Sequence, residues 1–417
     1  MALPDMRRRV FWVVALLALT RVIAAIPLPG INLDQLASFL EQNQALSLLN
    51  LFTGGGLSNL SLALLGVGPY ITASIIFQLL SYTIPSLEQL QKEGEMGRRK
   101  INQYTRIATV PLAFLQSYGT LTLLRNSGAI TAWNPSTLLL MLLVSTAGSM
   151  LLMWLGELIS EHNLGNGMSL IITLGIVANV NTSIFNTASA IQVGGAALTN
   201  IGILGLIGLL TLAAVIMVNE GVRQIPISYA RNLRTRGLLG RVDSTLPVKI
   251  NTAGVVPIIF AVSLVLFPSV VAQFLKVSSN ASLVKAGEWI TTVFDQNSWT
   301  YMIIYFLLVC LFTFFYTFIL IKPDEMAENL QRQSGFIPGV RPGQETATHI
   351  TTIISRLTFP GAIFLGLIAV LPTVIQKISH ITTLSVGGTS VLIVVSVVLE
   401  TIRQVQAQIA TRTYDTA

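Results

Sequence analysis

Long apolar runs separated by short polar segments dominate the pattern of this chain. Each run holds about 20 residues, which is enough for a helix to cross ~30 Å of hydrocarbon. The pattern predicts ten such spans, at residues 10–29, 66–84, 105–124, 137–157, 168–187, 200–218, 253–273, 299–321, 357–375 and 386–404. The chain is therefore predicted to be an all-α polytopic membrane protein with ten transmembrane helices.

Two of the predicted spans begin with the same kind of interruption. Residues 66–69 read GVGP at the start of the second span, and residues 254–257 read GVVP at the start of the seventh. Proline and glycine both disfavour a continuous helix. Equivalent interruptions predict two pseudo-symmetric five-helix halves, residues 1–190 and 191–417, related as an inverted repeat around a central pore. An ordinary proline kink in a packed helix is the alternative interpretation of each break.

Positive charge is concentrated on one side of this predicted topology. The 417 residues are 52% hydrophobic and only 10% charged, with a formal net charge of +7. If the N-terminus is cytoplasmic, the outer side receives only Arg125, Lys276, Lys285 and Lys377, and Arg21 lies within a span. All other lysines and arginines then fall on the cytoplasmic side, as is typical of membrane proteins. Both termini are therefore predicted to be cytoplasmic.

Two long polar loops, residues 220–250 and 322–352, lie on the predicted cytoplasmic side. The first is too polar for a span and too short for a domain, which predicts a hairpin. The second has prolines and glycines around Arg341, which predicts a rigid turn that exposes this arginine. Charge that only fixes the orientation in the membrane is the alternative interpretation of both loops.

The spans carry little of the chemistry that enzymes and ion-coupled transporters need. Glu157, Glu220 and Glu400 fall near the ends of spans, where a charge is tolerated. Cys310 is the only cysteine, and the sequence has neither an HExxH motif nor a phosphate-binding glycine loop. We expect no catalytic residues, no cofactor and no metal. An intramembrane enzyme is therefore disfavoured.

The residues beside the two breaks are aliphatic. Val67 and Ile71 follow the first break, and Ile259 follows the second. Such residues at the centre of a two-fold arrangement suggest a constriction that excludes water and ions. From the residues alone, ordinary helix packing is the favoured interpretation, and a secondary transporter with a central solute site is a further alternative.

Five segments spread along the chain carry a more specific signal. They are GVGPYITASIIFQLL (66–80), KEGEMGRRKINQYTR (92–106), WLGELISEHNLGNGMSL (154–170), FIPGVRPGQET (336–346) and GGTSVLIVVSVV (387–398). In their order and spacing they closely resemble the SecY family, the protein-conducting channel subunit of the bacterial Sec translocase. The resemblance covers nearly the whole chain. It implies a channel for unfolded secretory polypeptides that also releases membrane-protein helices sideways into lipid.

The resemblance also assigns roles to particular residues. It implies a pore ring made of Val67, Ile71, Met168, Ile172, Ile259 and Ile393. A plug at about residues 48–60 would include Leu51, Phe52, Gly54, Gly55, Leu57 and Leu60. Gln78 and Asn251 match polar residues of a lateral gate between spans two/three and seven/eight, and Arg236, Arg241 and Arg341 match the docking surface for a motor or ribosome.

The implied partners follow from the same resemblance. They are small SecE-type and SecG-type membrane subunits, the SecA motor ATPase, the ribosome, signal-sequence-bearing polypeptides and membrane lipids. The implied location is the cell membrane, with a plastid thylakoid membrane as the alternative.

Overall fold

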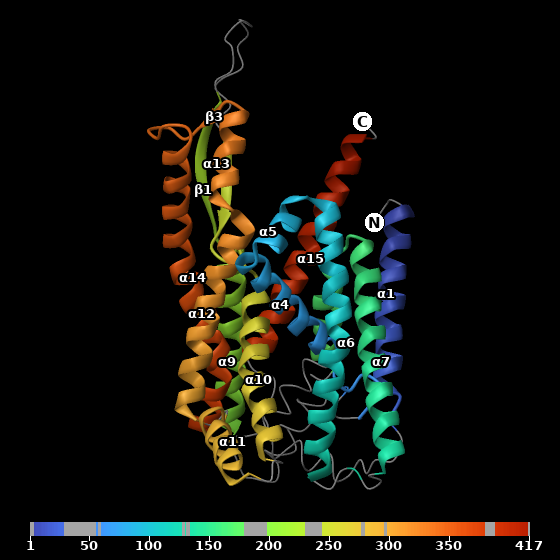
Figure 1. The fold of residues 1–417 in the computed structure, drawn as a ribbon. Coiled ribbons are helices and arrows are strands. Elements are labelled where there is room, and N and C mark those ends of the chain that lie inside the picture. The colour runs from blue at the N-terminus through green and yellow to red at the C-terminus, as the bar shows by residue number, and fades with distance from the viewer. Residues whose placement is uncertain are drawn as a thin grey trace, which may run out of the picture.

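The structure is a computed structural model that describes residues 4–28, 56, 60–126, 130, 134–178, 198–229, 244–276, 280–295, 298–379 and 388–415. The described chain is mostly helical (Figure 1). Its first half contains α1 (Pro4–Ala25), α4 (Gly68–Thr83), α5 (Pro85–Lys92), α6 (Glu95–Asn126), α7 (Pro135–Glu161) and the short helix Gly167–Ala178. Its second half contains α9 (Leu198–Glu220), α10 (Val256–Lys276), α11 (Ala281–Val293), α12 (Trp299–Ile321), α13 (Pro323–Arg332), α14 (Gln344–Ser379) and α15 (Gly388–Asp415).

Local sequence signals explain where several of these helices begin and end. Proline occupies the first turn of α4, α5, α7 and α13, where its missing amide hydrogen costs no helical hydrogen bond. Ser298 caps α12, because its hydroxyl accepts a hydrogen bond from the amide of Thr300 at 3.3 Å. Pro85 holds the preceding residue in an extended conformation, and α4 and α5 consequently meet at a bend of 100°.

Each of the ten predicted spans overlaps a helix, although the fifth is described only as far as Ala178. By length and apolar composition alone, four helices among the described residues could cross a membrane, or up to five if the bent pair α4 and α5 is one span. The chain is therefore a membrane protein with several apolar helices.

The two sequence interruptions adopt the same backbone conformation. Gly66 and Gly254 have φ angles of 56° and 65°, which lie in the left-handed region that only glycine enters without strain. Proline follows in each case within the first turn of a new helix, α4 or α10. The breaks are thus true helix starts rather than kinks within continuous helices.

A small sheet joins the two long polar loops. Strand β1 (Val222–Tyr229) pairs antiparallel with β2 (Ser244–Lys249) on one side and with β3 (Gly335–Phe336) on the other, giving the order β2-β1-β3. The predicted hairpin in the first loop is confirmed, because β1 and β2 form it. The purely helical prediction was wrong at this end. The sequence pattern missed β3 because two residues are too few for any periodicity.

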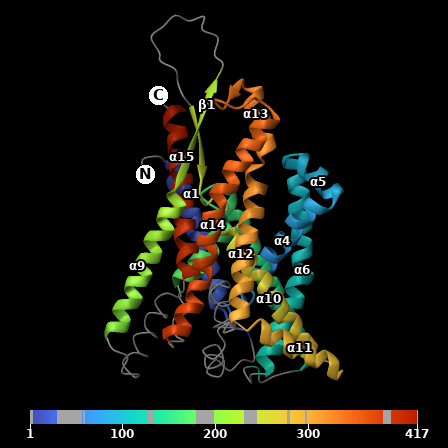
Figure 2. The same cartoon turned by 90° about the vertical axis from the view of Figure 1, so that its left-hand side faces the viewer.

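The sheet shares one apolar core with the neighbouring helices. Side chains from β1, β2, α13, α14 and the residue after β3 make up this core: Ile225, Ile227, Val248, Leu330, Ile337, Ile350 and Ile354. We call β1, β2 and residues 323–354, which hold α13, β3, the turn with Arg341 and the first turns of α14, the sheet module. It lies at the same end of the molecule as both chain termini (Figures 1 and 2).

Candidate functional site

All six residues of the implied pore ring belong to one apolar cluster. Val67, Ile172, Ile259 and Ile393 are buried in it, and Ile71 and Met168 pack against it half-buried. The cluster also takes side chains from α1, α7, α9, α12 and α14. We call it the central cluster. Four separate segments of the chain thus place their candidate side chains in the same apolar environment.

The two breaks place equivalent isoleucines in equivalent positions. Ile71 and Ile259 follow Gly66 and Gly254 by the same number of residues. The amide of Ile71 donates to the carbonyl of Val67 at 3.1 Å, and the amide of Ile259 donates to the carbonyl of Val255 at 3.3 Å. The repeated glycine–proline break therefore sets the local position of one candidate side chain in each half.

Met168 is positioned by a helix cap and by a glycine. The side-chain oxygen of Asn166 accepts a hydrogen bond from the amide of Met168 at 3.0 Å, which caps the helix Gly167–Ala178. A Cβ atom at Gly156 would lie only 2.5 Å from the Met168 sulfur. Gly156 of α7 thus provides the space that the thioether occupies.

Most of the implied plug lies outside the described residues. This applies to Leu51, Phe52, Gly54, Gly55 and Leu57.

Leu60 is the one plug candidate in the described part of the chain. It is fully buried in a second apolar cluster with Leu28, Leu64 and side chains of α6 and α7. Its carbonyl accepts a hydrogen bond from the amide of Leu28 at 2.8 Å. Leu60 therefore packs next to the end of α1 and is not a member of the central cluster.

The two lateral-gate candidates are polar side chains with one unsatisfied atom each. Gln78 of α4 donates from Nε2 to the hydroxyl of Ser74 at 3.3 Å, and its buried Oε1 has no hydrogen-bond partner among the described residues. Asn251 lies between β2 and α10 and donates from Nδ2 to Oδ1 of Asn219 at 2.7 Å, while its own Oδ1 finds no partner in the same described part of the chain. Buried acceptors of this kind are costly in a closed structure.

Arg341 is presented on a well-formed turn, as predicted. Gly339 and Gly343 flank it with φ angles of 85° and 101°. The hydroxyl of Thr346 donates to the Arg341 carbonyl at 2.8 Å and fixes the turn to α14. The Arg341 side chain is 87% exposed, with only a loose contact of 3.9 Å to Glu345. Arg236 and Arg241, the other two docking candidates, lie outside the described residues.

Comparison with known proteins identifies the family. A family model described as SecY matches residues 61–402. The chain belongs to the SecY family. It is 42% identical to the protein translocase subunit SecY of Halalkalibacterium halodurans, over 98% of this chain and 96% of that protein. It is 39% identical to the protein of the same name in Mycobacterium bovis, over 99% and 96% of the two chains.

Solved structures show the same fold at lower sequence identity. "The structure of a protein conducting channel" aligns with a TM-score of 0.63 and 18% identity, over 94% of this chain and 91% of that one. Sec61 in a canine ribosome–channel complex aligns with a TM-score of 0.58 and 17% identity over the same shares. At these identities the likeness supports the SecY fold alone.

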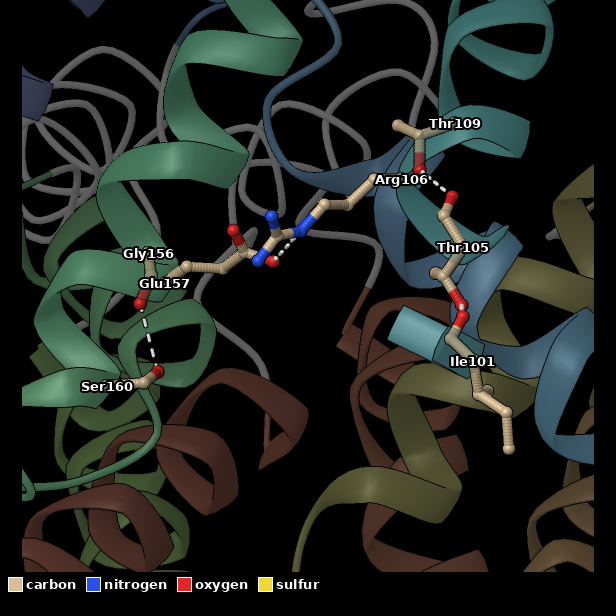
Figure 3. A network of polar contacts seen from close by, with 7 residues as sticks. All are labelled: Ile101, Thr105, Arg106, Thr109, Gly156, Glu157 and Ser160. Atoms are coloured by element: carbon tan, nitrogen blue, oxygen red, sulfur yellow. Dashed lines mark hydrogen bonds and ion pairs between the residues drawn. The ribbon is translucent and has the colours of Figure 1, made fainter. Parts of the chain in front are cut away.

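An ion pair between α6 and α7 was missed by the sequence analysis of this SecY-family chain. Arg106 Nε lies 2.8 Å from Glu157 Oε1, and the Glu157 side chain is only 18% exposed (Figure 3). One turn further on, the Ser160 hydroxyl donates to the Gly156 carbonyl at 2.9 Å and accepts from the Gly167 amide. This chain of contacts ties α6, α7 and the helix that carries Met168 together. The sequence did hold a signal for this ion pair. Arg106 and Glu157 carry opposite charges, and both lie near the predicted cytoplasmic ends of neighbouring spans.

A second polar group joins α9 to α15 in the other half. Asn219 and Glu220 of α9 contact Ser396 and Arg403 of α15. Neither residue stood out in the sequence, because Asn219 lies at the polar end of an apolar run, next to Glu220, and Ser396 is a single polar residue within one. Among the described residues, no group of three or more His, Cys, Asp or Glu side chains is arranged to hold a metal ion.

Proposed function

We propose that this chain is the central channel subunit of a protein translocase. Unfolded secretory polypeptides would pass through the central cluster, and apolar helices would leave sideways into the membrane. The observation that carries the proposal is that the six candidate pore residues, which come from four segments between residues 67 and 393, meet in one apolar cluster in a SecY-family chain.

An apolar constriction suits a cargo of arbitrary sequence. Fixed polar groups would recognise only some polypeptides, whereas aliphatic side chains contact any of them without directional bonds. The thioether of Met168 adds a flexible surface that adapts to varied shapes. At rest the same side chains would exclude water and ions.

The sideways exit would lie where α4 and α6 face α10 and α12. Tyr82 of α4 packs edge-on against Phe315 of α12, with ring centroids 5.6 Å apart. Helix α10 also packs against α4 and α6. The unsatisfied acceptors of Gln78 and Asn251 support this location, because parting helices would give both atoms access to new donors.

The finer architecture belongs to the same proposal. Ten spans would form two five-helix halves, residues 1–190 and 191–417, in a cell membrane with both termini and the sheet module in the cytoplasm. The module would dock a motor ATPase of the SecA type or a ribosome through Arg341, together with Arg236 and Arg241. Small SecE-type and SecG-type subunits would complete the complex, and the chain itself would catalyse no reaction.

A site-directed crosslink tests the proposal. In a Cys310→Ser background, Ile259→Cys is placed in the central cluster and Leu264→Cys on the exposed side of the same helix, where Leu264 is 43% exposed. A secretory polypeptide with its own cysteine is then stalled in membranes that contain the partners and the motor. We expect a disulfide with the cysteine at 259 and none with the cysteine at 264.

The absence of a crosslink at position 259 would argue against the proposed channel function. Confirmed stalling without a crosslink at position 259 would show that the polypeptide does not pass the central cluster. A secondary transporter with a central solute site would then be the better function. Solute binding that is lost on changing Gly68 or Gly254, with secretion unaffected, would support that alternative.

A further inference from the structure

Three buried polar side chains form a continuous hydrogen-bonded chain beside the central cluster. Asn251 Nδ2 donates to Asn219 Oδ1 at 2.7 Å, and Asn219 Nδ2 donates to the Ser396 hydroxyl at 2.6 Å. The three residues are only 6–9% exposed. They belong to the segment before α10, to α9 and to α15, so Asn219 bridges two other parts of the chain.

The same place anchors both strands of the hairpin. The Ile250 amide, next to the end of β2, donates to the Gly221 carbonyl, next to the start of β1, at 2.9 Å. Arg403 of α15 then lies 2.6 Å from Glu220 Oε1 and donates to the Asn219 carbonyl at 3.2 Å. An ion pair and a hydrogen bond from Arg403 therefore attach the base of the β1–β2 hairpin to α15.

This attachment is adjacent to two candidate pore residues. Ser396 lies one turn beyond Ile393 on α15, which places the two side chains on the same side of the helix. Asn251 lies in the short segment that leads through Gly254 into α10 and Ile259. A movement of the hairpin relative to α15 would thus displace Ile259 relative to Ile393.

The chain of hydrogen bonds is incomplete in the present arrangement. Within the part of the chain that the structure describes, the buried Oδ1 of Asn251 has no hydrogen-bond partner, although Nδ2 of the same amide is bonded. An unsatisfied buried acceptor raises the free energy of this arrangement relative to one in which the acceptor finds a donor. The present arrangement therefore carries a cost that another arrangement of the same residues could relieve.

We propose that Asn219 is a positioning residue that, through simultaneous hydrogen bonds to Asn251 and Ser396, latches the base of the β1–β2 hairpin and the start of α10 to α15 in the resting channel. The proposal rests on the proposed channel function. Opening of the channel breaks the Asn219–Ser396 contact. A partner that binds the sheet module and moves it would then displace the start of α10, and with it Ile259, through Asn251.

The first experiment weakens the latch and looks for a gain of function. Ser396→Ala and Asn219→Leu remove the bond with little change in volume, whereas Ser396→Thr keeps the hydroxyl. Ser355→Ala is the matched control, because the Ser355 hydroxyl bonds only to the Thr351 carbonyl of its own helix at 2.8 Å. The complete complex with its motor is reconstituted in vesicles. Export is measured for one precursor with an intact signal sequence and one with a shortened apolar core.

We expect export of the defective precursor to rise about tenfold in Ser396→Ala and Asn219→Leu, which corresponds to about 1.4 kcal/mol in favour of opening. Export of the intact precursor stays within twofold of wild type, and Ser396→Thr and Ser355→Ala behave as wild type. A purely structural role would lower both exports instead. Unchanged or reduced export of the defective precursor, at normal membrane levels of the variants, overturns the proposal.

The second experiment fixes the latch and does not depend on those variants. In a Cys310→Ser background, Asn219→Cys and Ser396→Cys are joined by a short, reducible thiol crosslinker. We expect crosslinking to reduce export of the intact precursor at least tenfold and reduction of the linker to restore it. Normal export through the crosslinked channel overturns the latch.

Failure of the latch and failure of the channel function are distinguishable. If the polypeptide crosslinks to the cysteine at 259 but the latch variants behave as wild type, the channel function stands and the latch does not. If that crosslink is absent in the wild-type background, the channel function itself fails.

Discussion

The central cluster and the sheet module are both apolar cores, but they are assembled in opposite ways. The central cluster gathers side chains from helices that are far apart in the sequence, through contacts that have no preferred direction. The sheet module is fixed by strand register, with Ser228 opposite Phe336 and Ile225 opposite Leu246. A slip of one residue would turn every strand side chain to the wrong face. We expect the first core to adjust its shape more readily than the second.

This difference matches what each region would do in the proposed channel. A constriction for many polypeptides needs side chains that yield, whereas a docking surface needs charges at fixed positions. Arg341 illustrates the second case, because two left-handed glycines and the Thr346 hydroxyl define its turn.

The largest expected effect comes from reversing the charge of Arg341 in the sheet module. We expect Arg341→Glu to reduce motor-driven export to background while the protein accumulates normally in the membrane. The Arg341 side chain is 87% exposed and lies 3.9 Å from Glu345 in a loose ion pair, so its charge contributes little to the stability of the fold. Export into inverted membrane vesicles measures the effect.

Arg332→Glu is the matched control in the same module. Its side chain is 73% exposed and pairs only with Glu328 of its own helix. Similar losses in both variants would mean that overall charge, rather than the position of Arg341, attracts the motor. Normal export with Arg341→Glu would remove Arg341 from the docking surface.

The next prediction tests whether the central cluster also prevents ions from crossing the resting channel. We expect Ile259→Ser to increase the resting ion conductance roughly tenfold, because a hydroxyl allows water to enter an apolar constriction. Leu264→Ser on the exposed side of α10 should leave the conductance unchanged. Single-channel recording in planar bilayers measures both. Equal conductance in the two variants would assign Ile259 to ordinary helix packing.

Local chemistry made the breaks between helices predictable. The residues GVGP and GVVP disfavour a continuous helix by themselves, and the structure places a left-handed glycine and a new helix at each. The exposed turn at Arg341 was predictable for the same reason. In contrast, the aliphatic residues of the central cluster resemble those of any packed helix. The breaks drew attention to Val67, Ile71 and Ile259, whereas only the family resemblance singled out Met168, Ile172 and Ile393.

Contacts between distant residues were not predictable. Asn219 ends one apolar run and Ser396 lies within another, 177 residues further on, and no local pattern pairs them. The buried neighbours of Leu60 likewise depend on how α1, α6 and α7 come together. Strand β3 exists only because β1 passes beside it. In each case tertiary packing, rather than sequence period, decides the contact.

A matched pair of substitutions on one helix compares the two cores directly. Helix α14 contributes Ile350 to the sheet module and Ile368 to the central cluster, and both are buried. We expect Ile350→Ala to destabilise the protein by about 4 kcal/mol and Ile368→Ala by about 2 kcal/mol, because the cost of a cavity falls where neighbours can collapse into it. Limited proteolysis in a denaturant series measures both. A larger loss for Ile368→Ala would contradict the view that the central cluster is the more compliant core.

The smallest effect concerns the boundary between the two regions, at the end of β2. Burial, with a smaller contribution from Arg403, lowers the pKa of Lys249 below its ordinary value of 10.5, while Glu400 and Glu220 act in the opposite direction. At a given pH the neutral amine is therefore more populated than in a free lysine. We expect Lys249 to react faster with a neutral acylating reagent than Lys92, whose side chain is 69% exposed.

Two substitutions should move this rate in opposite directions. Glu220→Gln removes a charge that raises the pKa, so labelling should become faster, and Arg403→Gln removes one that lowers it, so labelling should become slower. Since the charged form is disfavoured in the folded state, stability should rise as the pH increases through the lowered pKa towards 10.5. Mass spectrometry of labelled protein over a pH series measures the rates. Equal rates for Lys249 and Lys92 would mean that partial burial at the end of β2 does not lower the pKa of Lys249.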